Sequence, residues 1–201
     1  MSTVERGLMP FRISICGVAE LHEFAGNVSH ILGILDPGTP QPEGYVHHPK
    51  ALRDEFRFYD IVTEESSRAL PTEADVTAIL KVGEKLAAQP VQHLLVHCYA
   101  GVSRSTASAV TLMAQRNPAR AADIFAALGD IRPKAWPNTV MIGHADRLLG
   151  LGGTLVEALR LHHIAVAHRY PEVRTLISSV GRGHELPAEY HAKGSVPDEP
   201  V

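Results

Sequence analysis

The stretch HLLVHCYAGVSRSTASAVTLMAQR, residues 93–116, constrains the fold more than any other part of this sequence. Its opening residues, 93–98, are apolar enough to form a strand in the middle of a sheet, buried on both faces. A loop of small residues follows, and from Ser103 onward small and apolar side chains favour a helix that lies close to the sheet. The sequence therefore predicts a strand, a tight loop and a helix in succession, a unit typical of α/β folds.

Strands and helices alternate along the rest of the chain. Strands are predicted over three more segments, residues 11–18, 28–35 and 55–61, with a short helical crossing between the first two. A helix is predicted from Pro71 to about Gln89, and three further helices over residues 119–131, 137–150 and 153–168. The predicted fold class is α/β, with a mostly parallel central sheet of four to five strands flanked by helices.

Composition limits the function. With 201 residues, one domain is expected over 1–180, and the polar, Pro-containing segment 181–201 is expected to be a disordered tail. The net charge of −3 argues against nucleic acid as a partner. No apolar run approaches the ~20 residues of a membrane span, and the start MSTVERGLMPFRISICG lacks the apolar region of a signal peptide. Two cysteines make no disulfide framework, so a reducing cytoplasm is the expected location.

Cys98 stands at the carboxyl end of a predicted strand, where an open parallel sheet forms its binding crevice. The N-terminus of the following helix presents unpaired N–H groups, and a tight loop can turn further N–H groups inward, so this junction favours an anion. Gly101 can take a backbone conformation closed to other residues, and Arg104 adds a planar fork that binds two phosphate oxygens. The predicted substrate-binding residues are Tyr99, Ala100, Gly101, Val102, Ser103 and Arg104.

The same field favours the thiolate form of Cys98, which is the form that attacks phosphorus. His97 can hold the loop backbone around the sulfur, and Ser105 offers a hydroxyl that can donate to the sulfur when it leaves. These residues imply attack on a phosphomonoester, a phosphocysteine intermediate and hydrolysis of that intermediate by water.

HCYAGVSRS, residues 97–105, resembles the signature of the protein-tyrosine phosphatase superfamily, in which His-Cys, five residues and Arg-Ser follow one another. It looks most like the small dual-specificity phosphatases and the short tyrosine-phosphatase-like proteins of bacteria. FYDI before the long helix and RPKAWPNTVMIGHADRLLG after the motif stand in the order of that family, so the resemblance covers roughly residues 11–150. It implies a phosphocysteine mechanism without metal or other cofactor, acting on a phosphorylated protein or a small phosphomonoester.

The chain departs from parts of that superfamily. It is short of the extra elements of receptor-like tyrosine phosphatases, and its loop lacks the lysines of phosphoinositide-directed relatives. The second departure disfavours phosphoinositide substrates. Inositol phosphates and RNA 5′ ends are kept as alternative substrates of the same chemistry.

The family also needs a general acid, an aspartic acid on a movable loop that protonates the leaving oxygen. Asp60 ends the third predicted strand, 38 residues before Cys98, which matches the order of the small phosphatases. Asp36 also follows a predicted strand and is a rival for this role. Glu64 and Glu65 are further alternatives.

Other function classes fit parts of the pattern. A rhodanese-like sulfur transferase also uses a cysteine in a strand-to-helix loop, but a loop of seven residues that ends in Arg suits phosphate better. A catalytically silent phosphate-binding module would typically have lost the nucleophile, the arginine or the acid, and all three are present.

The histidines and the second cysteine are predicted to be structural. Neighbouring side chains in the pairs 47–48 and 162–163 point to different sides, so no metal site is expected. Cys16 is expected to be a buried core residue, with a redox partnership with Cys98 as the alternative.

Overall fold

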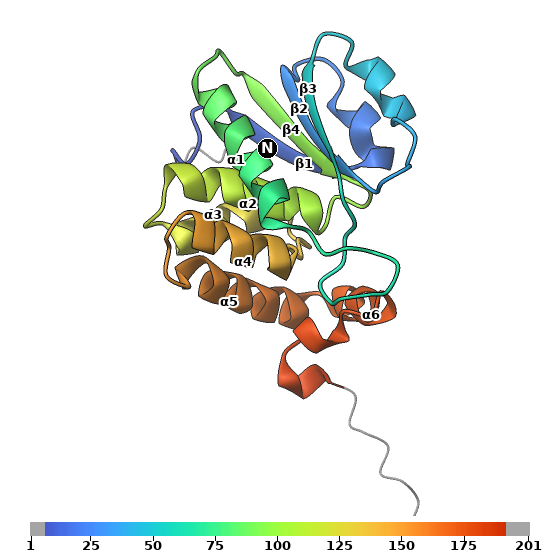
Figure 1. Cartoon of the computed structure of the whole chain (residues 1–201), viewed down its shortest axis with the longest axis vertical. Helices are drawn as coiled ribbons and strands as arrows, with labels where there is room; N and C mark the ends of the chain where they lie inside the picture. Colours follow the sequence, from blue (N-terminus) through green and yellow to red (C-terminus); the bar gives the residue numbers. More distant parts are fainter. Residues whose placement is uncertain (1–6, 192–201) are drawn as a thin grey trace, which may run out of the picture.

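The computed structural model describes residues 7–191, which form one four-stranded sheet with helices on both faces (Figure 1). The strands are β1 (Arg12–Gly17), β2 (His30–Leu35), β3 (Leu52–Arg57) and β4 (His93–Cys98). They lie in the order β1-β4-β2-β3, and every neighbouring pair is parallel. The α/β class and the central sheet are confirmed, with the strand number at the lower end of the predicted range.

Helices cover one face of this sheet in two layers (Figure 1). They are α1 (Glu73–Ala87), α2 (Arg104–Arg116), α3 (Ala121–Ile131), α4 (Thr139–Leu148) and α5 (Thr154–Arg169). Helix α2 packs on the sheet between its neighbours, and nearly all its residues are buried because Ala107, Ala109 and Ala114 allow a close approach. Helix α5 packs on α3 and α4 in the outer layer. The main core lies between the sheet and these helices.

The opposite face of the sheet is covered by two short 3₁₀ helices, η1 (Val18–Phe24) and η2 (Glu43–His47) (Figure 1). A smaller core lies beneath them and contains Cys16, Leu21 and Tyr45. No helix within residues 7–191 has both the length and the apolar character that crossing a bilayer requires.

Two predicted segments differ from the structure. Strand β3 spans Leu52–Arg57 rather than residues 55–61, so Asp60 lies in the connection that follows the strand rather than at the strand's end. The predicted disordered tail is ordered over residues 181–191, where η3 (Gly183–Glu185) and η4 (Ala188–Tyr190) follow α6 (Pro171–Ser179). Residues 192–201 of that tail, like the start of the chain up to residue 6, lie outside the described residues.

Candidate active site

The backbone carbonyls of the loop from Cys98 to Arg104 accept hydrogen bonds from residues outside the loop, and these bonds fix its position. Each carbonyl oxygen from Tyr99 to Ser103 accepts from a donor beyond the loop: Val18 N to Tyr99 O at 3.0 Å, Arg132 Nη2 to Ala100 O at 3.2 Å, Arg132 Nε to Gly101 O at 3.1 Å, Trp136 N to Val102 O at 2.9 Å and Ala107 N to Ser103 O at 2.9 Å.

This arrangement fixes the direction of the loop N–H groups. The peptides are trans, and in a trans peptide the N–H of the following residue points away from the carbonyl. The N–H groups of residues 100–104 therefore point to the concave side of the loop. None of them has an acceptor within residues 7–191. Such a row of unpaired N–H groups, next to the N-terminus of α2, is an arrangement that can bind an anion.

Gly101 lets this loop lie directly against the end of β1. Its φ is +70°, in the left-handed region that favours glycine. A Cβ at this position would lie 2.4 Å from the carbonyl carbon of Cys16 and 2.5 Å from the nitrogen of Gly17. Both the backbone conformation and the lack of room for a Cβ thus require glycine at this position. The sequence predicts the first of these two reasons.

Arg132 donates to two of these five carbonyls, a role that the sequence does not indicate. Its Nη1 donates to Glu20 Oε1 at 3.1 Å, and Glu20 Oε2 accepts from the Gly17 N–H at 2.6 Å. The guanidinium thereby links η1 to the loop. A single arginine in a connecting segment gives no sequence signal for this role.

The Cys98 side chain lies at the base of the loop and is almost fully buried. Its Sγ is 3.2 Å from Oγ of Ser105, which is itself fully buried on the first turn of α2. The Ser105 hydroxyl therefore lies within hydrogen-bond distance of the Cys98 sulfur, as its predicted role requires.

Arg104 is buried, and one end of its guanidinium is anchored. Nη1 donates to Asp36 Oδ1 at 2.5 Å and to the Phe58 carbonyl at 2.6 Å. Nε is buried and has no hydrogen-bond partner within residues 7–191, and Nη2 makes no hydrogen bond there either. Nε and Nη2 form the edge of a guanidinium that binds two oxygens side by side. The anchored arginine thus keeps its two-oxygen edge free.

The two candidate acids lie at different ends of this guanidinium. Asp60 Oδ1 accepts from Ser103 Oγ at 2.6 Å and from Asn138 Nδ2 at 3.0 Å, whereas Oδ2 has no hydrogen bond and lies 3.9 Å from Arg104 Nε. Asp36 contacts Nη1 instead. Asp60 therefore stands beside the free edge and Asp36 behind it. Of the further alternatives, Glu65 forms an exposed ion pair with Arg68.

His97 points to the opposite face of the sheet from Cys98, because successive side chains alternate along a strand. The hydroxyl of Tyr45 donates to Glu55 at 3.1 Å, and its oxygen lies 2.7 Å from His97 Nε2. Gly33 makes room for this pair, since a Cβ there would lie 2.7 Å from each atom. Burial lowers the pKa of His97 to about 4, against smaller opposing effects of Glu55 and the Cys98 backbone.

Buried histidines should make the fold acid-sensitive. Burial lowers the pKa of both His97 and His93 to about 4, while the unfolded chain titrates near 6.5. Between these values the unfolded state binds more protons, so stability is lost as the pH falls from 6.5 towards 4. We expect each histidine to remove roughly 2 kcal/mol from the free energy of unfolding between pH 7 and pH 5. Urea unfolding at the two pH values measures this, and equal free energies would contradict it. His97→Gln should reduce the difference.

The histidine pairs face different partners, as their spacing predicts. His48 Nε2 lies 2.8 Å from Leu21 O, His162 Nε2 lies 3.0 Å from Ala135 O, and the ring of His163 stacks on Trp136 at 3.9 Å. Within residues 7–191 no group of three or more His, Cys, Asp or Glu side chains is arranged to hold a metal ion.

Cys16 does not face Cys98. Cys16 pairs in register with His97, and Gly17 with Cys98, so the two thiols lie on opposite faces of the sheet. Burial raises the pKa of the Cys16 thiol to about 12. The buried core position is confirmed, and the geometry excludes a disulfide between the two cysteines without movement of the backbone.

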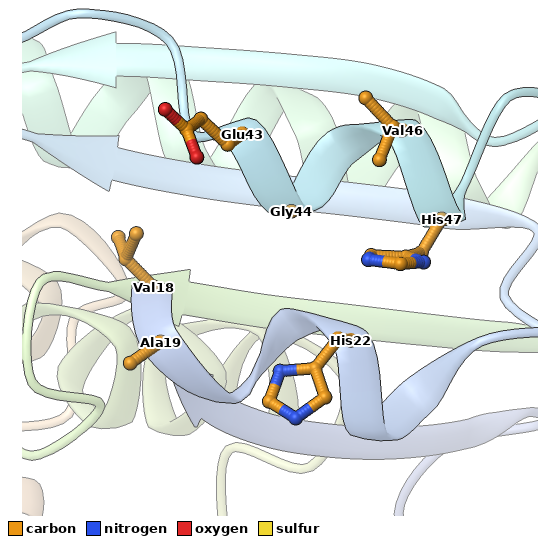
Figure 2. A pocket seen from close by; sticks show the side chains of 7 residues that line it. All are labelled: Val18, Ala19, His22, Glu43, Gly44, Val46 and His47. Atoms are coloured by element: carbon orange, nitrogen blue, oxygen red, sulfur yellow. The ribbon is translucent and has the colours of Figure 1, made fainter.

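A groove of about 490 Å³ lies between η1 and η2 (Figure 2). Its lining residues are Val18, Ala19, His22, Glu43, Gly44, Val46 and His47. His22 and His47 face each other across it, with ring centroids 6.3 Å apart. Tyr99, on the adjoining loop, is 73% exposed, which fits a residue at the rim of the site.

Solved structures with a similar arrangement of elements include phosphatases of the dual-specificity type. Human DUSP28 superposes with a TM-score of 0.53 at 16% identity, covering 69% of this chain and 91% of its own. Tk-PTP in its active form gives 0.52 at 15% identity, with 69% and 92% covered. The Yvh1 phosphatase domain from Chaetomium thermophilum gives 0.50 at 17% identity, with 71% and 93% covered.

These likenesses establish the fold. The chain has the fold of these small phosphatases, which confirms at the level of fold the resemblance carried by HCYAGVSRS. A scan against protein-family models finds no match, and no curated protein sequence matches the chain.

Proposed function

We propose that this protein is a cysteine-dependent phosphomonoester phosphatase of the protein-tyrosine or dual-specificity type. The observation that carries the proposal is the row of inward N–H groups at residues 100–104, with Cys98 Sγ at its base and the free edge of Arg104 at its end. The donors suit the three non-bridging oxygens of a phosphoryl group, and the sulfur lies where a nucleophile would be needed.

The reaction follows from these positions. The Cys98 thiolate attacks phosphorus, the S–P bond forms and the P–O bond to the leaving group breaks while that oxygen takes a proton from Asp60. The loop N–H groups and Arg104 stabilise the charge on the phosphoryl oxygens. Water then attacks phosphorus, Asp60 accepts a proton from it, and Ser105 donates a hydrogen bond to the departing sulfur. The products are the dephosphorylated substrate and inorganic phosphate.

The assignment of the acid to Asp60 is supported by the different surroundings of its two carboxylate oxygens. Oδ1 is occupied by Ser103 and Asn138, which leaves Oδ2 to carry a proton beside the free edge of Arg104.

The substrate class follows from the reaction and the loop. We propose a phosphorylated protein or a small phosphomonoester, reached over the exposed ring of Tyr99. Both cysteines are free, and a thiolate nucleophile works only when reduced, so a reducing cytoplasm suits the proposed activity. The test is release of inorganic phosphate from an activated aryl phosphate in the presence of EDTA and a thiol reductant. Lack of turnover, or a strict metal requirement, would contradict the proposal.

Substitution of the two aspartates should separate their roles. Asp60→Asn keeps an oxygen for Ser103 and Asn138 but replaces the proton-carrying oxygen by an amide. We expect a loss of about 10²-fold or more with phenyl phosphate, a much smaller loss with an activated aryl phosphate, and a flattened basic limb of the pH–rate profile. Asp36→Asn should slow both substrates by a similar factor, because it weakens the anchor of Arg104.

Steady-state kinetics with a series of aryl phosphates measures this difference. If Asp36→Asn shows the dependence on the leaving group and Asp60→Asn does not, the acid is Asp36. The sequence alone predicts little effect of Asp36→Asn beyond a modest loss of stability, and its bond to Arg104 changes that expectation.

A further inference from the structure

A second buried arginine reaches the loop from the C-terminal segment. Arg182 is only 6% exposed, and its Nη1 donates to Ser103 Oγ at 2.8 Å and lies 3.7 Å from Asp60 Oδ1. In Figure 1 the long connection between β3 and α1, which carries Asp60, runs down beside the C-terminal helices. Arg182 therefore contacts both the phosphate loop and the connection that carries the proposed acid.

The backbone before Arg182 directs it to this place. Gly181, two residues after the end of α6, lies in the left-handed region at a φ of +78°. The Gly181 N–H donates to Ser178 O at 3.1 Å and the Arg182 N–H to Ile177 O at 3.0 Å, which is the Schellman pattern of hydrogen bonds. This turn reverses the chain, and Leu186 then packs into the apolar cluster around Trp136.

A buried carboxylate fixes the guanidinium. Glu185 Oε2 accepts from Arg182 Nε at 2.7 Å and from Trp136 Nε1 at 3.0 Å, while Oε1 accepts from Thr139 Oγ1 at 2.6 Å. A charge that is paired and hydrogen-bonded in this way can be buried at an acceptable cost in free energy. Arg182 is thus held in one position relative to Ser103.

The direction of the Ser103 hydrogen follows from the chemistry of its partners. A guanidinium only donates, so Ser103 Oγ must accept from Arg182. The single hydroxyl hydrogen is then free for Asp60 Oδ1, 2.6 Å away. With Asn138 as a second donor, Oδ1 is occupied, and Oδ2 is the oxygen on which a transferable proton can sit.

We propose that Arg182 is a positioning residue of the phosphatase site, which acts through Ser103 to hold Asp60 with Oδ1 engaged and Oδ2 free to protonate the leaving oxygen. This inference rests on the proposed function and adds the C-terminal segment to the catalytic unit. Arg182 itself does not touch the reacting atoms.

The test compares Arg182→Met with Arg174→Met in the full chain. Arg174 lies on α6, where its Nη1 donates to Ala167 O at 2.7 Å and its guanidinium stacks on Tyr190 at 4.3 Å, without contact to Ser103 or Asp60. For Arg182→Met we expect a loss of about tenfold or more with phenyl phosphate and a loss within about threefold with an activated aryl phosphate. Arg174→Met should match the wild type with both substrates.

A double-mutant cycle with Ser103→Ala identifies the route. If Arg182 acts through the serine, Arg182→Met should add little to the loss already caused by Ser103→Ala. Equal losses with both substrates would overturn the inference, since a merely structural role predicts them. Arg182→Lys, which keeps a charged donor for Ser103, should lose less activity with phenyl phosphate than Arg182→Met, and it replaces Arg182→Met in the test if that variant does not fold.

Failure of this inference is distinct from failure of the proposed function. If the wild type hydrolyses the activated aryl phosphate and Arg182→Met has the same activity as the wild type with both substrates, only the role of Arg182 is overturned. Wild-type protein with no phosphatase activity overturns both.

Discussion

Cys98→Ser is expected to abolish hydrolysis of an activated aryl phosphate, with a loss of at least about 10⁴-fold in kcat. Serine has nearly the same shape, but its hydroxyl is a far weaker nucleophile than a thiolate. The anion-binding groups are backbone N–H groups and Arg104, and the substitution leaves them in place. The variant should therefore keep its unfolding midpoint and still bind vanadate.

Cys16→Ser is the matched control for this substitution. Cys16 is the other cysteine of the chain and lies on the opposite face of the sheet, so the same change there should leave kcat within about threefold of the wild type. Activity of Cys98→Ser within about tenfold of the wild type would contradict the mechanism.

Arg104→Lys should cost about 10³-fold in kcat/KM. Lysine keeps the positive charge and can still reach an oxygen, but it lacks the Nε and Nη2 edge that the structure leaves free for two phosphoryl oxygens. Arg160→Lys provides the control, because Arg160 pairs with Glu157 on the surface of α5 and should tolerate the change. A near-neutral Arg104→Lys, measured under the same conditions, would mean that the loop does not hold phosphate.

The strand, loop and helix of residues 93–116 could be predicted because their signal is local. Strand β4 has the predicted bounds, and α2 begins at Arg104, one residue after the predicted start. The unusual backbone conformation at Gly101 could be predicted because only glycine adopts it readily. The end of β3 could not be predicted from local sequence. The strand-like pattern of residues continues to residue 61, whereas the pairing of β3 with β2 stops at Arg57.

The contacts that complete the site are long-range and left no pattern in the sequence. Arg104 meets Asp36 across 68 positions, and Ser103 meets Arg182 across 79. A single arginine or a single aspartate in the sequence does not indicate which distant residue it will contact. The polar composition after residue 180 pointed to disorder, but a buried ion pair between Arg182 and Glu185 and one apolar anchor, Leu186, order residues 181–191.

The central claim is that Cys98 forms a covalent bond to phosphorus during turnover. Wild-type protein mixed rapidly with an activated aryl phosphate and quenched in acid, then digested and analysed by mass spectrometry, measures this directly. The peptide that contains Cys98 should carry the mass of one phosphoryl group, and the same peptide from Cys98→Ser treated identically should carry none. Turnover without an adduct, or an adduct on another residue such as a histidine, would contradict the account.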